Sequence, residues 1–258
     1  MLQINTIPKC FYPKLRVLNR LLGALKCSLL IQVQQVYNYI DSKPAEYERA
    51  LHIIRPRFCL SRSPYRVLTI DCHIRRSTIP QFLPNGSTNP RFTKTSWFRN
   101  IVKEIRLATP SDFELFIRIH TDGIHGQEVW RPPKEIAEAT IEYWNSLGVL
   151  NEVGDLILDS EDFTSQFQEF GLVAVIQDIN PIEAWELMAS SDILLIGKSS
   201  MSYLAGLIRS WRPVIFAKFW HTGLNSWLEV EENEQISVDT KLELRAIVNS
   251  TVRELSAN

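Results

Sequence analysis

The sequence has few cysteines and no long hydrophobic run, and each shortage excludes a class of protein. Its 4 cysteines lie in the first third of the chain, and none belongs to a CxxC pair of the kind found in zinc or thioredoxin-like sites. It has no stretch of about 18 uncharged apolar residues, so no membrane-spanning helix is predicted. The best apolar segment, 27–33, is too short and too far from the start for a secretory signal. We expect a reduced, cytoplasmic protein, with peripheral membrane attachment as the open alternative.

The composition excludes disordered, collagen-like and coiled-coil proteins, because 45% of the 258 residues are apolar and 22% are charged. The length suits one large α/β domain or about one and a half ordinary domains. The net charge of -1 hides an asymmetry, since residues 1–110 hold 18 Lys and Arg against 5 Asp and Glu, whereas residues 111–258 hold 10 against 24. A basic first part favours phosphate or another anion. No nucleic-acid partner is predicted, because the basic residues form no aromatic-interleaved or helix-turn-helix pattern.

The first part of the chain predicts a long helix. Apolar side chains recur at steps of three and four residues over 15–40, which indicates an amphipathic helix. Arg16, Arg20 and Lys26 lie off the apolar stripe, so the helix could rest on an anionic membrane surface. Packing against the rest of the domain or against a partner is favoured, and a homodimer through the helix at 15–40 is one form that such a partnership could take. We therefore divide the chain into two parts, an N-terminal helical segment, 1–65, and a domain that spans 66–258.

Beyond residue 65 strand patterns alternate with helix patterns, which is typical of an α/β fold with a parallel sheet covered by helices on both faces. A proline-containing polar stretch over 77–93 predicts a long loop after the first strand. The expected strands are 66–74, 113–119, 172–177, 192–196 and 213–217. The expected helices are 96–107, 133–146, 182–190, 200–210 and 239–255, the last with Asp239 as its N-cap.

Polar clusters follow three of these strands at their carboxyl ends, where open parallel sheets bind ligands. The first is His73-Ile74-Arg75-Arg76. Two adjacent guanidinium groups suit bidentate contacts to a diphosphate. In an extended backbone Arg75 and Arg76 point to opposite faces, so both serve one ligand only if the strand ends or bulges there. A pair of surface arginines matched to the acidic second part of the chain is the alternative.

The second cluster opens the segment GKSSMSYLAGL at 197–207. It places Lys198, Ser199, Ser200 and Ser202 near the first N–H groups of a helix, which bind phosphate through the amides and the helix dipole. Ordinary capping explains the serines equally well. The spacing GxxxxGK[ST] is absent, so ATPase chemistry is not predicted.

The third cluster consists of Arg118, His120, Asp122 and His125. A histidine beside an aspartate could act as a general base, and two histidines with an aspartate could hold a metal. The spacing H-x-D-x-x-H is not a specific metal signature, and a turn at Asp122 explains much of it. A solvated loop is the favoured reading, a substrate contact or base comes second, and a metal site comes last.

Aromatic residues follow the fifth predicted strand. Trp220, His221 and Trp227 either line a platform for a sugar ring or pack against the domain. Packing is the favoured reading.

Taken in their order along the chain, the motifs resemble the nucleotide-binding half of the fucosyltransferase-like glycosyltransferases over roughly residues 66–230. HIRR at 73–76 is similar to the family's strand-end H-x-R-R, whose arginine engages the donor diphosphate. DINPIEAWELMASSDILLIGKSSMSYLAGL at 178–207 is similar to the family's short helix, apolar strand and S-x-S-x-S segment ahead of a helix. FELFIRIHTDG at 113–123 lies where the family has a strand that ends in polar residues.

The resemblance implies that 66–258 is the Rossmann-like nucleotide-sugar-binding domain of a GT-B glycosyltransferase used in polysaccharide assembly, and that the helical segment 1–65 is a reduced first lobe. Such an enzyme would move a sugar, fucose by family likeness, from a GDP-sugar to a carbohydrate hydroxyl, with inversion and without a metal or cofactor. His73 would orient the donor, while Arg75, Arg76 and the 198–202 helix start would stabilise the leaving diphosphate. His120 and Asp122 are the candidates for the base.

The chain also departs from the family. Ser77 and Thr78 follow HIRR where the family has a small residue and then an acid, and no further acid occurs before Glu104. Met201 stands where an aromatic residue is common, and the residues before HIRR are too few for a complete first lobe. The alternative is therefore a non-catalytic glycan- or nucleotide-binding member that has lost transferase activity.

Overall fold

The chain divides into two units, Met1–Ala50 and Leu51–Asn258, and all residues described by the computed structural model belong to the second. The predicted helix over 15–40, with its membrane and dimer readings, lies outside the described residues, and the predicted boundary after residue 65 stays a prediction. No helix in the described part of the chain is long and apolar enough to cross a membrane. The described residues are 65–76, 79–121, 129–130, 138–148, 150, 153, 156–157, 161–177, 179–209, 212–233 and 235–257.

The main sheet has 6 strands, all paired in parallel. Its order across the sheet is β5-β2-β1-β6-β7-β8. Counted along the chain within this sheet, that is the order 3-2-1-4-5-6 of the doubly wound dinucleotide-binding fold. The predicted α/β, Rossmann-like fold class is confirmed. The strands are β1 (Val67–His73), β2 (Glu114–His120), β5 (Leu172–Ile176), β6 (Ile193–Ile196), β7 (Val214–Ala217) and β8 (Leu228–Val230).

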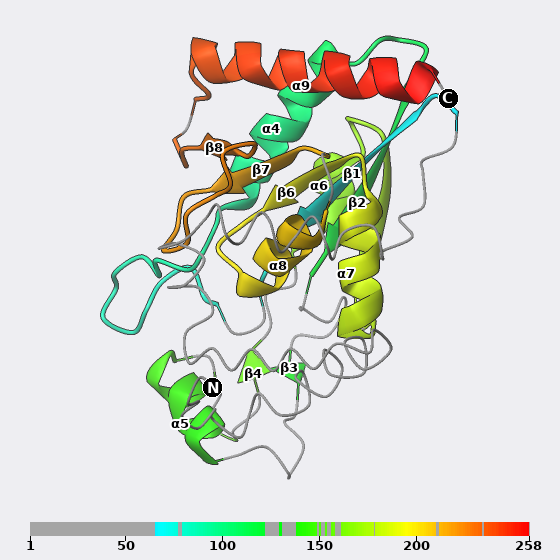
Figure 1. Cartoon of the computed structure of the whole chain (residues 1–258). Helices are drawn as coiled ribbons and strands as arrows, with labels where there is room; N and C mark the ends of the chain where they lie inside the picture. The colour runs from blue at the N-terminus through cyan, green and yellow to red at the C-terminus, as the bar shows by residue number, and fades with distance from the viewer. Residues whose placement is uncertain are drawn as a thin grey trace, which may run out of the picture. The chain divides into compact units, whose positions relative to one another are not determined.

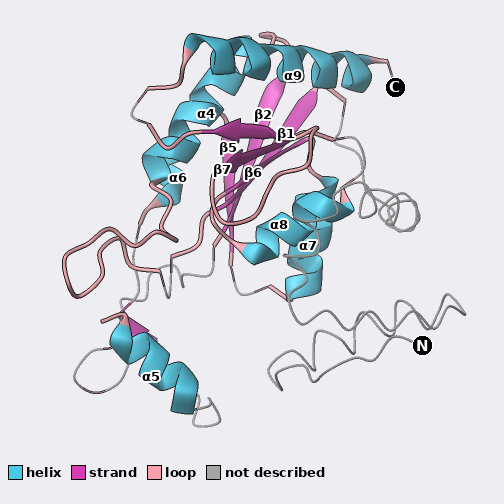
Figure 2. Ribbon diagram, turned by 60° about the vertical axis from the view of Figure 1, so that its left-hand side comes forward, coloured by secondary structure: helices cyan, strands magenta, loops and turns pink. Residues whose placement is uncertain are grey.

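Helices cover both faces of this sheet (Figures 1 and 2). On one face α4 packs against α9, and on the other α7 packs against α8. A separate antiparallel pair, β3 (Val129–Trp130) with β4 (Leu156–Ile157), flanks α5 (Glu138–Ser146) in the chain. The helices of the sheet are α4 (Thr95–Ala108), α6 (Phe163–Phe167), α7 (Pro181–Ser190), α8 (Ser200–Ile208) and α9 (Val238–Ser256).

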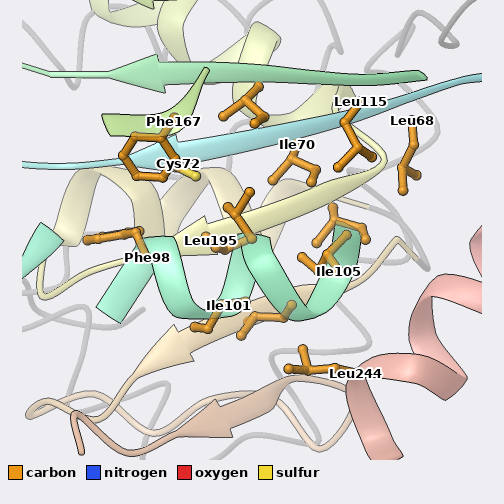
Figure 3. Packing of buried hydrophobic residues seen from close by; sticks show 14 of the residues in the cluster. Leu68, Ile70, Cys72, Phe98, Ile101, Ile105, Leu115, Phe167, Leu195 and Leu244 are labelled. Carbon is orange, nitrogen blue, oxygen red and sulfur yellow. The ribbon is translucent and has the colours of Figure 1, made fainter. Parts of the chain in front are cut away.

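The main core lies between the sheet and α4 (Figure 3). Alternate residues of β1, Leu68, Ile70 and Cys72, point into it because side chains alternate between the faces of a strand. From α4, Ile101 and Ile105 lie one turn apart on the face that meets them. Each aliphatic side chain buried in this way stabilises the fold by roughly 1.5–3 kcal/mol. The other face of β1, towards α7 and α8, therefore receives the polar residues of the strand.

The structure corrects one predicted detail and adds four short elements. Asp239 is not the N-cap of α9, because the hydroxyl of Ser237 accepts the Thr240 N–H at 3.1 Å and places Asp239 in the first turn. The added elements are β8, α6 and the β3–β4 pair, which are too short to produce a readable period in the sequence.

Candidate functional site at the carboxyl edge of β1 and β6

The topological switch point of the sheet lies between β1 and β6. His73, the last residue of β1, pairs with Ile196 of β6 on one side and with His120 of β2 on the other. HIRR and the turn at 197–199 therefore leave the sheet side by side, at the edge where folds of this order bind their ligands. The structure thus brings the first and second polar clusters together and places the described part of the third beside them.

The segment that leads into α4 joins the two strand ends. Thr95 Oγ1 accepts a hydrogen bond from Arg76 Nη2 at 2.5 Å, and Thr93 Oγ1 accepts one from the Lys198 N–H at 3.4 Å. A Cβ on Gly197 would lie 3.1 Å from Thr93 Oγ1, so a side chain there would crowd this contact. The starts of α4 and α8 are therefore held against each other at this edge.

Arg76 is buried and directed towards the start of α4. Its Nε donates to Glu161 Oε2 at 2.9 Å, and its guanidinium lies 4.3 Å from the ring centroid of Phe92. The Thr95 hydroxyl also donates to Glu161, at 2.7 Å. Glu161, 85 residues further along the chain, thus supplies a carboxylate to the second arginine of HIRR. Arg75, by contrast, stays half-buried, so it is the more accessible arginine of the pair.

The two helices that begin at the switch point, α4 and α8, lack a side-chain cap. At the N-cap positions of α4 and α8, the side chains of Lys94 and Ser199 accept no hydrogen bond from a backbone N–H of the first turn. Elsewhere Asp162, Asn180 and Ser237 each accept a backbone N–H at the start of α6, α7 and α9. Uncapped N–H groups of a first turn carry partial positive charge and bind anions. Among the helices whose N-caps are described, those at the switch point are the ones without such an acceptor.

The residues that open α8 divide into structural and accessible ones. Ser199 and Ser202 are buried, and the Ser202 hydroxyl donates to the Ser199 carbonyl at 3.2 Å. Ser200 stays half-buried at the first position of the helix. The ammonium group of Lys198 forms an ion pair with Glu232, which follows β8. Of the three predicted serines, Ser200 is therefore best placed to meet a ligand.

Sequence reasoning missed Asp71, which is fully buried at the centre of a polar network on the α7–α8 side of the sheet. Its Oδ1 accepts from Arg118 Nε at 2.6 Å, and its Oδ2 lies 2.9 Å from His120 Nε2. Arg118 also donates to the Leu187 carbonyl of α7 at 2.9 Å. A carboxylate within the otherwise apolar run of β1 was the signal that could have revealed the network.

This network determines the tautomer of His120. An aspartate paired with a guanidinium is a carboxylate, which only accepts hydrogen bonds, so His120 Nε2 carries the hydrogen. In the neutral form of the ring, the lone pair is then on Nδ1, which is buried without a hydrogen-bond partner in the described structure. A neutral imidazole oriented by a carboxylate has the form of a general base.

Asp122 and His125, the rest of the third cluster, lie outside the described residues. Among the residues that are described, no group of three His, Cys, Asp or Glu side chains is arranged to hold a metal ion. His73 is buried at the end of β1, on the same face of the strand as Asp71.

Two buried groups of the domain have shifted pKa values. Desolvation by burial lowers the pKa of Arg209 to about 9, an effect that the neighbouring Arg212 reinforces. Arg209 follows α8 and donates to the carbonyls of Met188 and Ser191 at 2.6 and 2.9 Å, which ties α8 to the end of α7. Burial, with a contribution from the Asp71 charge, raises the pKa of the Cys72 thiol.

No family model matches the sequence, and no curated protein matches it. Among the solved structures that resemble it, one is described as trehalose-6-phosphate from E. coli bound with UDP-2-fluoro glucose, and another concerns retaining glycosyl transfer by trehalose-6-phosphate synthase. The identities are 8% and 10%, and the TM-score is 0.32 for both. Each match covers 80% of this chain and 47% of the other, so the chain spans about half the length of the structures it matches. A likeness this weak carries no argument about activity.

Proposed function

We propose that this chain binds a nucleoside diphosphate sugar at the carboxyl edge of β1 and β6 and transfers the sugar to a carbohydrate hydroxyl. The observation that carries the proposal is the meeting, at the switch point, of HIRR with two helices that lack side-chain caps. The resemblance of HIRR and of residues 178–207 to the fucosyltransferase-like glycosyltransferases favours a GDP-sugar, with fucose as the first sugar to test. The donor site of this proposal consists of Arg75, Lys198, Ser200 and the first turns of α4 and α8.

In the proposed reaction, positive groups stabilise the leaving nucleoside diphosphate. Arg75 and the N–H groups of the α8 first turn donate to the phosphate oxygens, and Lys198 exchanges Glu232 for a phosphate oxygen. These groups lie where negative charge develops as the bond to the anomeric carbon breaks, so the transfer proceeds without a metal. Arg76 acts indirectly, because its ion pair with Glu161 positions the segment that carries Arg75.

The acceptor oxygen attacks the anomeric carbon opposite the diphosphate, which inverts the configuration at that carbon. The electron pair of the broken bond leaves with the diphosphate oxygen, and the proton of the acceptor hydroxyl goes to a base. His120 Nδ1 is the base in this proposal, with Asp71 as the residue that holds its tautomer.

One observation favours a second candidate function, which is binding without transfer. His120 Nδ1 is covered by protein, so an acceptor hydroxyl reaches it only if the ligand displaces the covering atoms. A nucleotide- or glycan-binding protein requires the anion site and no such access.

The experiment is a thermal-shift titration of the full chain with GDP, UDP, ADP and their sugar conjugates, because a specific ligand stabilises the native state by mass action. At 100 times its Kd, a ligand stabilises by about 2.7 kcal/mol. GDP compounds are expected to raise the Tm selectively, and Arg75→Ala to abolish that shift. Arg99→Ala, which removes a surface ion pair of α4 with Glu169, is the matched control.

The proposal fails if no nucleotide shifts the Tm of the parent protein, or if Arg75→Ala retains the whole shift. Release of GDP from GDP-fucose, measured with and without a panel of glycans, then separates transfer from binding. Acceptor-dependent release supports the transferase. Selective GDP binding without release supports the second candidate.

A further inference from the structure

Trp220 lies on the surface just after β7, and half of its side chain (50%) is exposed. Since β7 pairs in parallel with β6, the residues after β7 leave the sheet at the same edge as the proposed donor site. Trp220 is therefore one strand away from the switch point.

The ring of Trp220 is exposed and yet fixed in place. Its Nε1 donates to His221 Nε2 at 2.9 Å, and the ring meets Phe219 edge-on at a centroid distance of 5.2 Å. Phe219 and His221 both contact the buried ring of Tyr203 in α8. A tryptophan that only fills a core buries both of its faces, whereas an exposed, immobilised ring offers contact area at little entropic expense on binding.

Arg91, from the loop after β1, connects Trp220 to a second exposed ring. Its guanidinium carbon lies 5.7 Å from the Trp220 ring centroid, and its Nη1 donates to the hydroxyl of Tyr143 in α5 at 3.0 Å. Tyr143 is 44% exposed. The Arg91 backbone is fixed as well, because its N–H donates to Asn89 Oδ1 at 3.0 Å.

The charge of Arg91 is not neutralised by the described protein. No carboxylate among the described residues pairs with it, and its Nε is buried without an acceptor. A guanidinium without a carboxylate favours an oxyanion, and because Nε is covered, the oxyanion would accept from the Nη groups. Trp220, Arg91 and Tyr143 thus place two aromatic surfaces beside an uncompensated positive charge.

We propose that these three residues form an acceptor subsite for an acidic carbohydrate, a chain that carries uronate groups. The inference rests on the proposed function, because a transferase must hold an acceptor beside its donor. The apolar C–H face of a pyranose ring packs on Trp220, the sugar carboxylate pairs with Arg91, and the Tyr143 hydroxyl bonds a ring hydroxyl. A neutral sugar would leave the guanidinium charge unmatched, so the acidic chain is preferred.

The test uses the full chain and two tetrasaccharides of equal length, a tetragalacturonate and the neutral cellotetraose, with binding followed by tryptophan fluorescence and calorimetry. The acidic chain is expected to bind at least about tenfold more tightly, a difference of about 1.4 kcal/mol. Trp220→Ala and Arg91→Gln are expected to lose this binding, and Tyr143→Phe to weaken it. Nucleotide-dependent Tm shifts should stay unchanged in all three variants.

The matched control is Arg66→Gln. Arg66 lies 5.1 Å from the ring of Tyr65, which is 69% exposed, and this arginine–aromatic pair precedes β1 at the opposite edge of the sheet. This variant should bind tetragalacturonate like the parent. Circular dichroism identifies a variant that fails to fold, and Tyr143→Phe then still tests the site, because it removes one exposed oxygen.

Equal binding of both tetrasaccharides, or unchanged binding by Arg91→Gln and Trp220→Ala, would overturn the proposal. Loss of the GDP-dependent Tm shift in Trp220→Ala would also overturn it, by assigning the ring to the nucleobase. If no nucleotide stabilises the parent while tetragalacturonate binding depends on Arg91 and Trp220, the carbohydrate site is supported and the transferase proposal is the one that fails.

Discussion

Arg76 and Glu161 form an ion pair, with Nε and Oε2 2.9 Å apart, between the end of β1 and the residues just before α6. The arginine side chain is 1% exposed, whereas the glutamate is 26% exposed. The arginine therefore depends on this contact more than the glutamate does, because water can solvate the glutamate but barely reaches the arginine. Both side chains also bond the Thr95 hydroxyl. The residues before α6 are thus joined to the end of β1 and to the start of α4.

Replacement of Glu161 by Ala is expected to destabilise the protein by about 3 kcal/mol, because a buried guanidinium loses its ion pair with this carboxylate. Urea unfolding measures the change. The control is Glu169→Ala, which breaks the exposed pair with Arg99 and should change the free energy of unfolding by less than about 1 kcal/mol. Equal effects of the two substitutions would show that the Arg76 pair is not a buried one.

Replacement of Asp71 by Asn is expected to release the tautomer of His120. Nitrogen chemical shifts of the imidazole should show a protonated Nε2 and a bare Nδ1 in the parent, and a mixture of tautomers in the variant. If His120 is the base, transfer should fall by about 10²–10⁴-fold in kcat with little change in KM. A protonated Nδ1 in the parent protein at neutral pH would contradict the assignment.

Cys72 is expected to resist thiol reagents in the folded protein, because its pKa is raised by burial and the thiolate is the reactive form. The measurement uses a variant with Cys10, Cys27 and Cys59 replaced by Ser, in native buffer and in urea. Rapid labelling without urea would show that the side chain is accessible and would contradict its burial.

The same thiol predicts a pH dependence of stability. Above about pH 8.5 the unfolded thiol loses its proton while the folded one keeps it, so the folded state binds more protons and stability falls as pH rises. The loss approaches about 1.4 kcal/mol per pH unit until the folded pKa is passed. A Cys72→Ala variant should lack this component, and parallel stability curves for the two proteins would refute it.

Replacement of Ser237 by Ala should destabilise the protein by about 1 kcal/mol, because the Thr240 N–H at the start of α9 loses its acceptor. Asp239→Ala removes only a favourable charge near the helix start, so its effect should be about 0.3–1 kcal/mol and should diminish in high salt. Thermal unfolding at two salt concentrations distinguishes these substitutions. A larger, salt-independent effect at Asp239 would restore it as the cap.

Most of the sheet and its helices could be predicted, because the apolar side chains that bury them recur at readable periods. The alternation of Leu68, Ile70 and Cys72 predicts β1, and the three- and four-residue steps of Phe98, Ile101 and Ile105 predict α4. The three residues of β8 carry no such period. The cap of α9 is Ser237 because its hydroxyl accepts the Thr240 N–H, a hydrogen bond that the nearby Asp239 carboxylate is equally able to accept by its chemistry. Short elements and cap positions are therefore where the prediction stops.

The location of the candidate site could be predicted from the sequence, but the contacts between its side chains could not. Polar residues at three strand ends indicate a ligand edge, whichever strands are neighbours. Asp71 and its partners Arg118 and His120 are 47 and 49 residues apart in the chain, and no local pattern relates them. The same is true of Arg91 and Trp220, which come from the connections after β1 and β7.

By itself the sequence determined the fold class and the edge that carries the polar clusters, because burial of apolar side chains leaves a periodic record along the chain. Only the tertiary structure decided which of the charged groups are neutralised. Parallel pairing of β1 with β2 and β6 directs Asp71 to Arg118 and His120, and the fold as a whole brings Glu161 to Arg76, while no described carboxylate reaches Arg91. Ion pairing depends on distances of a few ångströms between atoms remote in sequence, and folding alone sets those distances.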